Sequence, residues 1–127
     1  MKNPKAIAAD NAGKIQMHLV PLPVLHEVAQ GMAEGAAKYG AYNWRAMPIE
    51  THEYYNATRR HLDSWFMGED IDPDSDLHHV TKAITSLIVL RDAMIHGTAI
   101  DTRPLSAAFA ALAERVPRSA RRQGTGQ

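Results

Sequence analysis

Cysteine is absent from this chain of 127 residues. The absence excludes a disulfide framework and a thiolate metal site, so any metal ion would have to be held by carboxylates and imidazoles. A chain without cysteine also suits a reducing compartment, and we expect a cytoplasmic protein.

An excess of one charge is missing as well. Lys and Arg together number 14, and Asp and Glu together also number 14. No general attraction to nucleic acid follows, so we expect no direct nucleic-acid binding, and any polyanionic ligand needs a local site. The longest apolar region, around Ile84 to Leu90, is too short to cross a bilayer, and the amino terminus lacks the apolar run of a signal peptide. We therefore expect no membrane association.

Helical spacing of apolar residues runs through the middle of the chain. It predicts a helix from about Pro21 to Tyr39, a second over residues 51–67 with Thr51 as a cap, and a third from the acidic segment 69–76 to about His96. Glycine is a natural helix terminator, and it follows all three helices at Gly40, Gly68 and Gly97. Residues 1–20 read as irregular, and no strand pattern is evident.

The expected fold is therefore all-α. We predict a small bundle of three to four helices formed by one domain over residues 1–104, ordered from about residue 13. A short C-terminal helix over 105–116 and a disordered tail over 117–127 follow it. Three short helices enclose a thin core and leave apolar faces to cover, so we expect a homodimer or homotetramer.

The apolar spacing predicts a core face for the first and the third helix. In the first helix it is Leu25, Val28, Met32, Ala36 and Tyr39, with Glu27, Glu34 and Lys38 on the opposite side. In the third helix it is Leu77, Val80, Ile84, Leu87 and Met94.

Groups suited to binding a metal and phosphate are concentrated between Glu34 and His79. The region mixes carboxylates and histidines with lysines and arginines, which is the combination that cutting a triphosphate needs. A divalent metal neutralises phosphate oxygens and acidifies water, and basic side chains stabilise the departing diphosphate.

Three segments in this region carry a recognisable pattern. They are EGAAKYGAYNWR (34–45), RRHLDSWFMGEDIDPDS (59–75) and HVTKAITSLIVLRDAMIHG (79–97). In this order they resemble the phage and bacterial dATP/dGTP diphosphohydrolase family, and the resemblance covers about residues 13–104.

The resemblance implies a MazG-like, all-α pyrophosphohydrolase. Such enzymes convert dGTP and dATP to dGMP and dAMP plus diphosphate, and phages with MazZ-type members use dGMP in 2-aminoadenine nucleotide synthesis. Dimers or tetramers are expected. The implied cofactor is a divalent metal, Mg²⁺ or Mn²⁺, with Co²⁺ as a further possibility.

Nine of the candidate site residues match polar positions of the family pattern; their roles, and the choice of Trp44 and Arg45, are our own inference from residue chemistry. The candidate metal ligands are Glu34, His61, Glu69, Asp72 and His79. The candidate catalytic residues are Glu34, Lys38 and Lys82. The candidate substrate-binding residues are Asn43, Trp44, Arg45, Arg60, Lys38 and Lys82.

The chain departs from the family pattern at two positions. Asn56 stands where an Asp is usual in the second helix, and Asp76 stands where a Gly usually precedes Leu77. The tandem Glu-x-x-Glu and Glu-x-x-Asp motifs of other MazG-like enzymes are also missing, so their metal geometry does not transfer.

The residues leave structural alternatives open. Glu34 and Lys38 could be an ordinary surface pair, His61 a satisfied core residue, Trp44 a packing anchor, and the acidic segment a solvated turn. At the level of function, an HD-type phosphohydrolase using the histidines and a non-enzymatic binding module are the two rivals. The first is weakened by the lack of an adjacent His-Asp pair.

Overall fold

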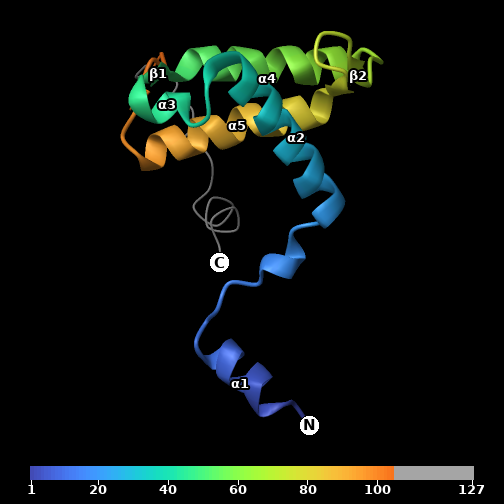
Figure 1. Cartoon of the computed structure of the whole chain (residues 1–127), viewed down its shortest axis with the longest axis vertical. Coiled ribbons are helices and arrows are strands. Elements are labelled where there is room, and N and C mark those ends of the chain that lie inside the picture. The colour runs from blue at the N-terminus through green and yellow to red at the C-terminus, as the bar shows by residue number, and fades with distance from the viewer. Residues whose placement is uncertain (105–127) are drawn as a thin grey trace, which may run out of the picture.

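The computed structural model describes residues 1–104 and is dominated by helices (Figure 1). The elements of the structure, in chain order, are α1 (Pro4–Asn11), the 3-10 turn η1 (Met17–Leu19), α2 (Leu22–Tyr39), α3 (Asn43–Ala46), β1 (Ile49–Glu50), α4 (Thr51–Phe66), β2 (Ile71–Asp72), β3 (Leu77–His78), α5 (His79–Ile95) and β4 (Ala99–Ile100). Helices α4 and α5 lie side by side, and α2 crosses them. The all-α prediction is confirmed.

Helices α2 and α4 lie where their periodicity placed them, and α5 lies within the range predicted for the third helix. Helix α2 ends at Gly40, whose φ of 90° is a left-handed conformation that glycine adopts without steric cost. Glycines also follow α4 and α5 closely, at Gly68 and Gly97, both with positive φ. The predicted helix at 105–116 and the predicted tail at 117–127 lie outside the described residues.

Several local predictions are wrong. Residues 1–20 are not wholly irregular, because α1 and η1 form there. The third helix does not begin in the acidic segment: β2 and β3 form an antiparallel hairpin first, and α5 begins at His79. Strands of two residues give too little alternation for a period-2 pattern, which explains why the sequence showed none.

A second small pairing joins the two ends of the α4–α5 unit. Strand β1 pairs in parallel with β4, with Ile49 opposite Ala99. Thr51 is the first residue of α4 and not its cap, a position that Glu50 holds. The Thr51 hydroxyl instead lies 3.1 Å from the Thr102 hydroxyl and accepts from the Thr102 backbone, so it ties the chain after β4 to the start of α4.

The apolar core is small and lies at the C-terminal end of α5. Trp44, Ile49, Val89 and Ala93 form its buried cluster. The predicted core face of α5 is partly wrong, since Leu87 is 49% exposed and Met94 is 45% exposed. Small and polar side chains occupy the inward face of α5, because neighbouring helices approach it closely.

The predicted faces of α2 are partly wrong, since Val28 is buried and Met32 packs against the core as predicted. Leu25 and Tyr39, predicted for the core, are exposed, whereas the polar stripe meets α5. Thr81 donates to Glu27 (2.8 Å), and Lys82 forms an ion pair with Glu34. Helix α2 packs on α5 through these polar contacts as well as through apolar side chains, so its hydrophobic periodicity indicated only part of the buried side.

A glycine makes this close approach of α2 and α5 possible. A Cβ atom built on Gly31 would lie only 2.5 Å from Thr85 Cγ2. Since atoms at that distance overlap, a larger residue would push the helices apart.

Among the described residues, none of the helices combines the length and the apolarity needed to cross a bilayer.

Candidate functional site

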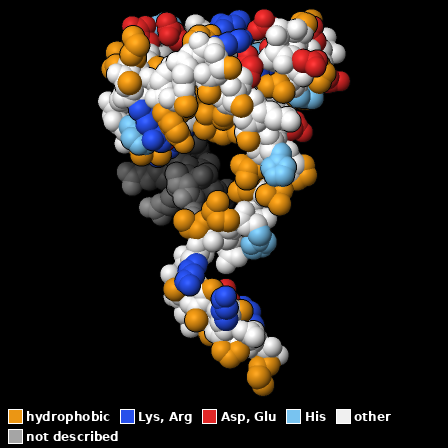
Figure 2. All heavy atoms as spheres, viewed as in Figure 1, with side chains coloured by type: hydrophobic (Ala, Val, Ile, Leu, Met, Phe, Trp, Pro, Cys, Tyr) orange, Lys and Arg blue, Asp and Glu red, His pale blue; other side chains and the backbone are white. Residues whose placement is uncertain are grey.

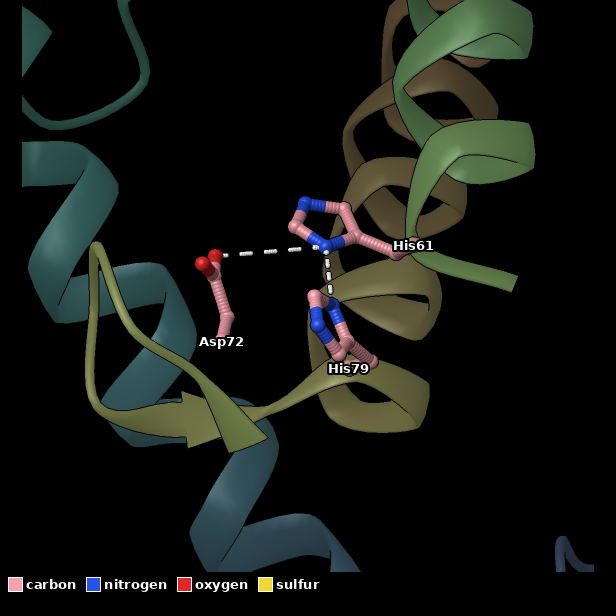
Figure 3. A group of neighbouring side chains, drawn as sticks. All are labelled: His61, Asp72 and His79. Atoms are coloured by element: carbon pink, nitrogen blue, oxygen red, sulfur yellow. Dashed lines mark hydrogen bonds and ion pairs between the residues drawn. The ribbon is translucent and has the colours of Figure 1, made fainter. Parts of the chain in front are cut away.

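Three side chains from three elements converge beside α2 (Figure 3). His61 projects from α4, Asp72 from the β2–β3 hairpin, and His79 from the first turn of α5. His61 Nδ1 lies 2.9 Å from His79 Nδ1 and 4.0 Å from Asp72 Oδ2. These ligand atoms lie within 4.8 Å of one another, so one cation could bind all three.

Glu69 fixes the orientation of His79. His79 Nε2 donates to Glu69 Oε1 at 2.6 Å, and the backbone N–H of His79 donates to the Asp70 carbonyl at 2.8 Å. With its proton on Nε2, His79 presents the lone pair of Nδ1 toward His61 and Asp72. This carboxylate–histidine arrangement is the usual support behind a metal-binding imidazole.

Burial keeps His61 in its neutral form. Desolvation lowers the pKa of His61 below its usual value, and neighbouring cationic groups act in the same direction against the opposing charge of Asp72. The neutral imidazole is the form that binds metal ions.

Glu34 lies on the α2 side of the site between two lysines. Lys82 contacts Oε2, and Lys38 Nζ lies 2.7 Å from Oε1 and 3.3 Å from Asp74. Burial raises the pKa of Glu34, but the two ammonium groups prevail and lower it, so the carboxylate is ionised at neutral pH. Within the described part of the chain, the buried Oε1 accepts no hydrogen bond of good geometry and keeps a lone pair for a cation.

A groove of about 1240 Å³ runs from this polar end to an aromatic end. Helices α2, α4 and α5 and the loop after α2 form its walls. Its polar end is lined by Glu34, Lys38, Arg60, His61, Asp72 and Lys82. Its other end is lined by Met32, Asn43, Trp44, Tyr54, Ser86 and Val89. The size and this division suit a ligand that is anionic at one end and flat at the other.

The loop at the aromatic end is anchored by one carboxylate. Trp44 is only 7% exposed, and its indole N–H donates to Asp92 at 2.7 Å. Arg45 makes two hydrogen bonds to the same group, at 2.8 and 3.1 Å, and its guanidinium lies over the Tyr42 ring. Arg45 and Trp44 hold the pKa of Asp92 down at about 2, so the anchor is charged at neutral pH.

Residues 4–103 match the family model of the dATP/dGTP diphosphohydrolase N-terminal domain. The chain belongs to this family. It is also 30% identical over 102 residues to a protein of Salmonella phage PMBT28 named dATP/dGTP diphosphohydrolase. The alignment covers 80% of this chain and 34% of that relative, so the chain spans about a third of the length of the curated relative it matches. No solved structure matches it.

In this member of the dATP/dGTP diphosphohydrolase family, the five candidate metal ligands occupy three different positions. The structure gathers His61, Asp72 and His79 as one group. Glu69 stands behind His79, and Glu34 lies outside the group, facing the lysines. The sequence predicted all five as metal ligands and did not distinguish these three positions.

The candidate substrate residues of this family member divide similarly. Asn43, Trp44 and the exposed Arg60 line the groove. Asp92 holds both Trp44 and Arg45. Sequence reasoning missed Asp92. Its signal was a single carboxylate inside the long apolar run of the third motif, a position at which an acid needs a partner.

Proposed function

We propose that the chain is a nucleoside triphosphate diphosphohydrolase that converts dGTP and dATP to dGMP and dAMP plus diphosphate. The observation that carries the proposal is the groove, which joins a metal-binding and cationic end to an aromatic end. Family membership and the printed name of the phage relative support the substrate class.

A divalent cation fits the three gathered ligands. Two donors bound about 2.1 Å from one ion lie about 3 Å apart at a right angle and about 4 Å apart at wider angles. The separations of 2.9 and 4.0 Å at His61 agree with this requirement. Two imidazoles and one carboxylate suit Mn²⁺ or Co²⁺ better than Mg²⁺, which prefers oxygen ligands. We therefore rank Mn²⁺ first.

When bound, the cation supplies a Lewis acid that withdraws charge from phosphate oxygens and acidifies a water molecule. Glu34 is ionised and faces the same groove, so it accepts a proton from the attacking water or supports a second cation. The water oxygen bonds to the α-phosphorus, and the bond from the α-phosphorus to the bridging oxygen breaks, with diphosphate as the leaving group.

Basic side chains hold the charge of the leaving group. Lys82 and Lys38 both contact Glu34, and Arg60 lines the same end of the groove. A triphosphate entering the site exchanges the Glu34 contacts of the lysines for phosphate oxygens, which frees Glu34 for its role. These cations stabilise the negative charge that accumulates on the departing diphosphate.

The aromatic end positions the nucleoside. Tyr54 and the anchored Trp44 give a flat apolar wall, and Asn43 and Ser86 offer hydrogen bonds to the edge of a base or to the sugar. In a phage-infected cell this activity would supply dGMP for 2-aminoadenine nucleotide synthesis in the cytoplasm. The phage origin of the named relative supports this setting.

The test is product analysis with each dNTP and GTP, with and without Mn²⁺, Co²⁺ or Mg²⁺. We expect metal-dependent dGMP and dAMP with diphosphate in equal amounts. The gathered His61, Asp72 and His79 also fit an HD-type phosphohydrolase, which would release tripolyphosphate or orthophosphate. Absence of any product with every metal would leave the non-enzymatic binding module as the function.

We also propose that the protein acts as a homo-oligomer, a dimer or tetramer. The described residues leave many large apolar side chains exposed on helices α2, α4 and α5. Light scattering at micromolar concentration should give a mass at least twice that of the chain, whose own mass is 14.0 kDa. A monomer would contradict this part of the proposal without affecting the hydrolysis.

A further inference from the structure

The first 27 residues contribute no buried side chain to the described chain, although Glu27, at their end, accepts a hydrogen bond from Thr81 of α5. Every residue from Met1 to Glu27 is exposed except Ala9, which is half-buried. Neither α1 nor η1 contributes a buried residue, and this arm extends away from the bundle (Figure 1). We call residues 1–27 the N-terminal arm.

The arm is apolar for a segment that lies in water. Figure 2 shows hydrophobic side chains spaced along its length. The large ones, with exposures between 42% and 84%, are Ile7, Ile15, Met17, Leu19, Val20, Leu22, Val24 and Leu25. An isolated eight-residue helix such as α1 is marginal in water, so the arm needs a surface that covers it. The family match starts at residue 4, so relatives share this segment.

Within residues 1–104, the bundle also has an exposed apolar stripe. Leu87, Met94 and Ile95 lie on the side of α5 opposite its buried residues, with exposures of 49%, 45% and 65%. Arg91 lies among them at helical spacing and is also exposed. If two copies of the chain exchange arms about a two-fold axis, each arm covers the stripe of the other copy, and both apolar surfaces are buried.

We propose that the N-terminal arm packs on the Leu87–Met94–Ile95 stripe of a second copy, and that the exchange is reciprocal. The inference rests on the proposed homo-oligomer and names the surfaces that form it. A fully buried aliphatic side chain removes on the order of 100 Å² from water, so eight partly exposed ones remove roughly 500 Å². By the same measure the three stripe residues remove roughly 160 Å², so two arms and two stripes bury about 1,300 Å², within the ~1,200–2,000 Å² range typical of a specific interface.

The experiment uses one variant on each surface. Leu19→Asp with Leu22→Asp places two charges in the arm, and Leu87→Asp with Ile95→Asp places two on the stripe. Each variant alone should be a monomer by light scattering, because burying an unpaired carboxylate is costly. Gln16→Asp changes a polar residue of the arm and should leave the dimer intact. Circular dichroism at 222 nm checks that the helices are retained.

Mixing the two variants is the decisive step. In a mixed dimer, the intact arm of the stripe variant meets the intact stripe of the arm variant, so one of the two contacts survives. We expect mixing to restore a dimer with weaker affinity than that of the wild-type chain. If mixing restores nothing, the arm and the stripe are not partners.

The other outcomes separate the two proposals. A wild-type monomer overturns both the homo-oligomer and the arm exchange. A dimeric arm variant overturns the arm exchange alone and leaves the oligomer to another surface, and a stripe variant that unfolds leaves the arm variant as the test. Diphosphate release is measured separately in every case, so hydrolysis is judged independently of assembly.

Discussion

The two halves of α5 are built on opposite principles. The C-terminal half carries Val89 and Ala93, which pack against Trp44 and Ile49 in the apolar core. The N-terminal half carries His79, Thr81, Lys82 and Thr85, which are polar side chains facing α2, α4 and the hairpin. The C-terminal half of the helix stabilises the bundle, and the N-terminal half supplies polar side chains to the candidate site.

The difference between the two halves shows that polar site residues stabilise the fold less readily than apolar core residues do. Ala93 has no exposed surface, so the C-terminal half gains from burial without needing partners. In the N-terminal half, each buried polar group needs a specific partner, as Glu34 needs Lys82 and His79 needs Glu69. Changes at the polar end should therefore reduce activity more than stability, and changes at the apolar end should do the reverse.

The largest effect is expected at Glu34. Glu34→Gln removes the charge that faces the groove and should lower kcat for dGTP by at least about 100-fold, the loss typical of a missing acid–base group. The melting temperature should change little, because Gln keeps the size of the side chain. Asp63→Asn on the exposed side of α4 is the matched control and should keep full activity. Retained activity in Glu34→Gln would contradict the proposed mechanism.

The support behind His79 gives the next largest effect. Glu69→Ala removes the acceptor at 2.6 Å from His79 Nε2, so the imidazole is no longer held in its orientation. Loss of such support typically weakens metal affinity by about 10- to 100-fold. Titration with Mn²⁺ followed by calorimetry measures it without relying on turnover. Asp70→Asn, whose side chain is 73% exposed, should bind Mn²⁺ normally; equal affinities in both variants would remove Glu69 from the site.

The contact between α2 and α5 can be broken at Gly31. A methyl group there would overlap Thr85 Cγ2, and overpacking of this kind costs about 1–3 kcal/mol, which exceeds the ~1 kcal/mol that alanine gains in a helix. Urea denaturation should show Gly31→Ala to be less stable than the wild type.

Two further variants sharpen this result. Gly35 has nothing within 4 Å of an added Cβ, so Gly35→Ala should be neutral or stabilising. Thr85→Ser removes Cγ2 and keeps the hydroxyl that donates to the Lys82 carbonyl, so it should restore most of the stability lost in Gly31→Ala. Additive losses in the double variant would show that the two residues do not collide.

The smallest effect concerns the anchor at the apolar end. Asp92 has a pKa of about 2 in the folded chain against 3.8 for the free group, so its stabilising effect is full above pH 3.8 and is lost as the pH falls toward 2. Asp92→Asn should therefore melt a few degrees below the wild type at pH 6, and this difference should shrink between pH 4 and pH 2. A difference that stays constant over that range would mean that the Arg45 and Trp44 contacts do not depend on the charge.

Asp76 illustrates how far the sequence could be interpreted. The sequence showed that Asp76 replaces the glycine of the family pattern, but it did not show the structural reason why glycine is usual there. The structure shows a φ of 60° at Asp76, a left-handed conformation that glycine adopts freely and that Asp tolerates better than most residues. The turn between β2 and β3 required that conformation, and only its backbone angles reveal it.

The sequence by itself determined the three main helices and the glycines that follow them, and it predicted which polar residues form the candidate site. Helix propensity, periodicity and terminators act over a few residues, so they can be interpreted locally. Family resemblance supplied the chemistry of Glu34, His61, Glu69, Asp72 and His79, which no spacing rule defines.

Only the tertiary structure decided which faces are buried and which polar residues meet. Helices α2 and α5 pack partly through Gly31 and polar pairs, so their apolar periodicity predicted only some of the buried residues. The grouping of His61, Asp72 and His79, and the anchoring of Trp44 by Asp92, join residues 7 to 48 positions apart. Contacts of that range depend on how helices cross, and the crossing is set by side-chain fit between elements that no local pattern contains.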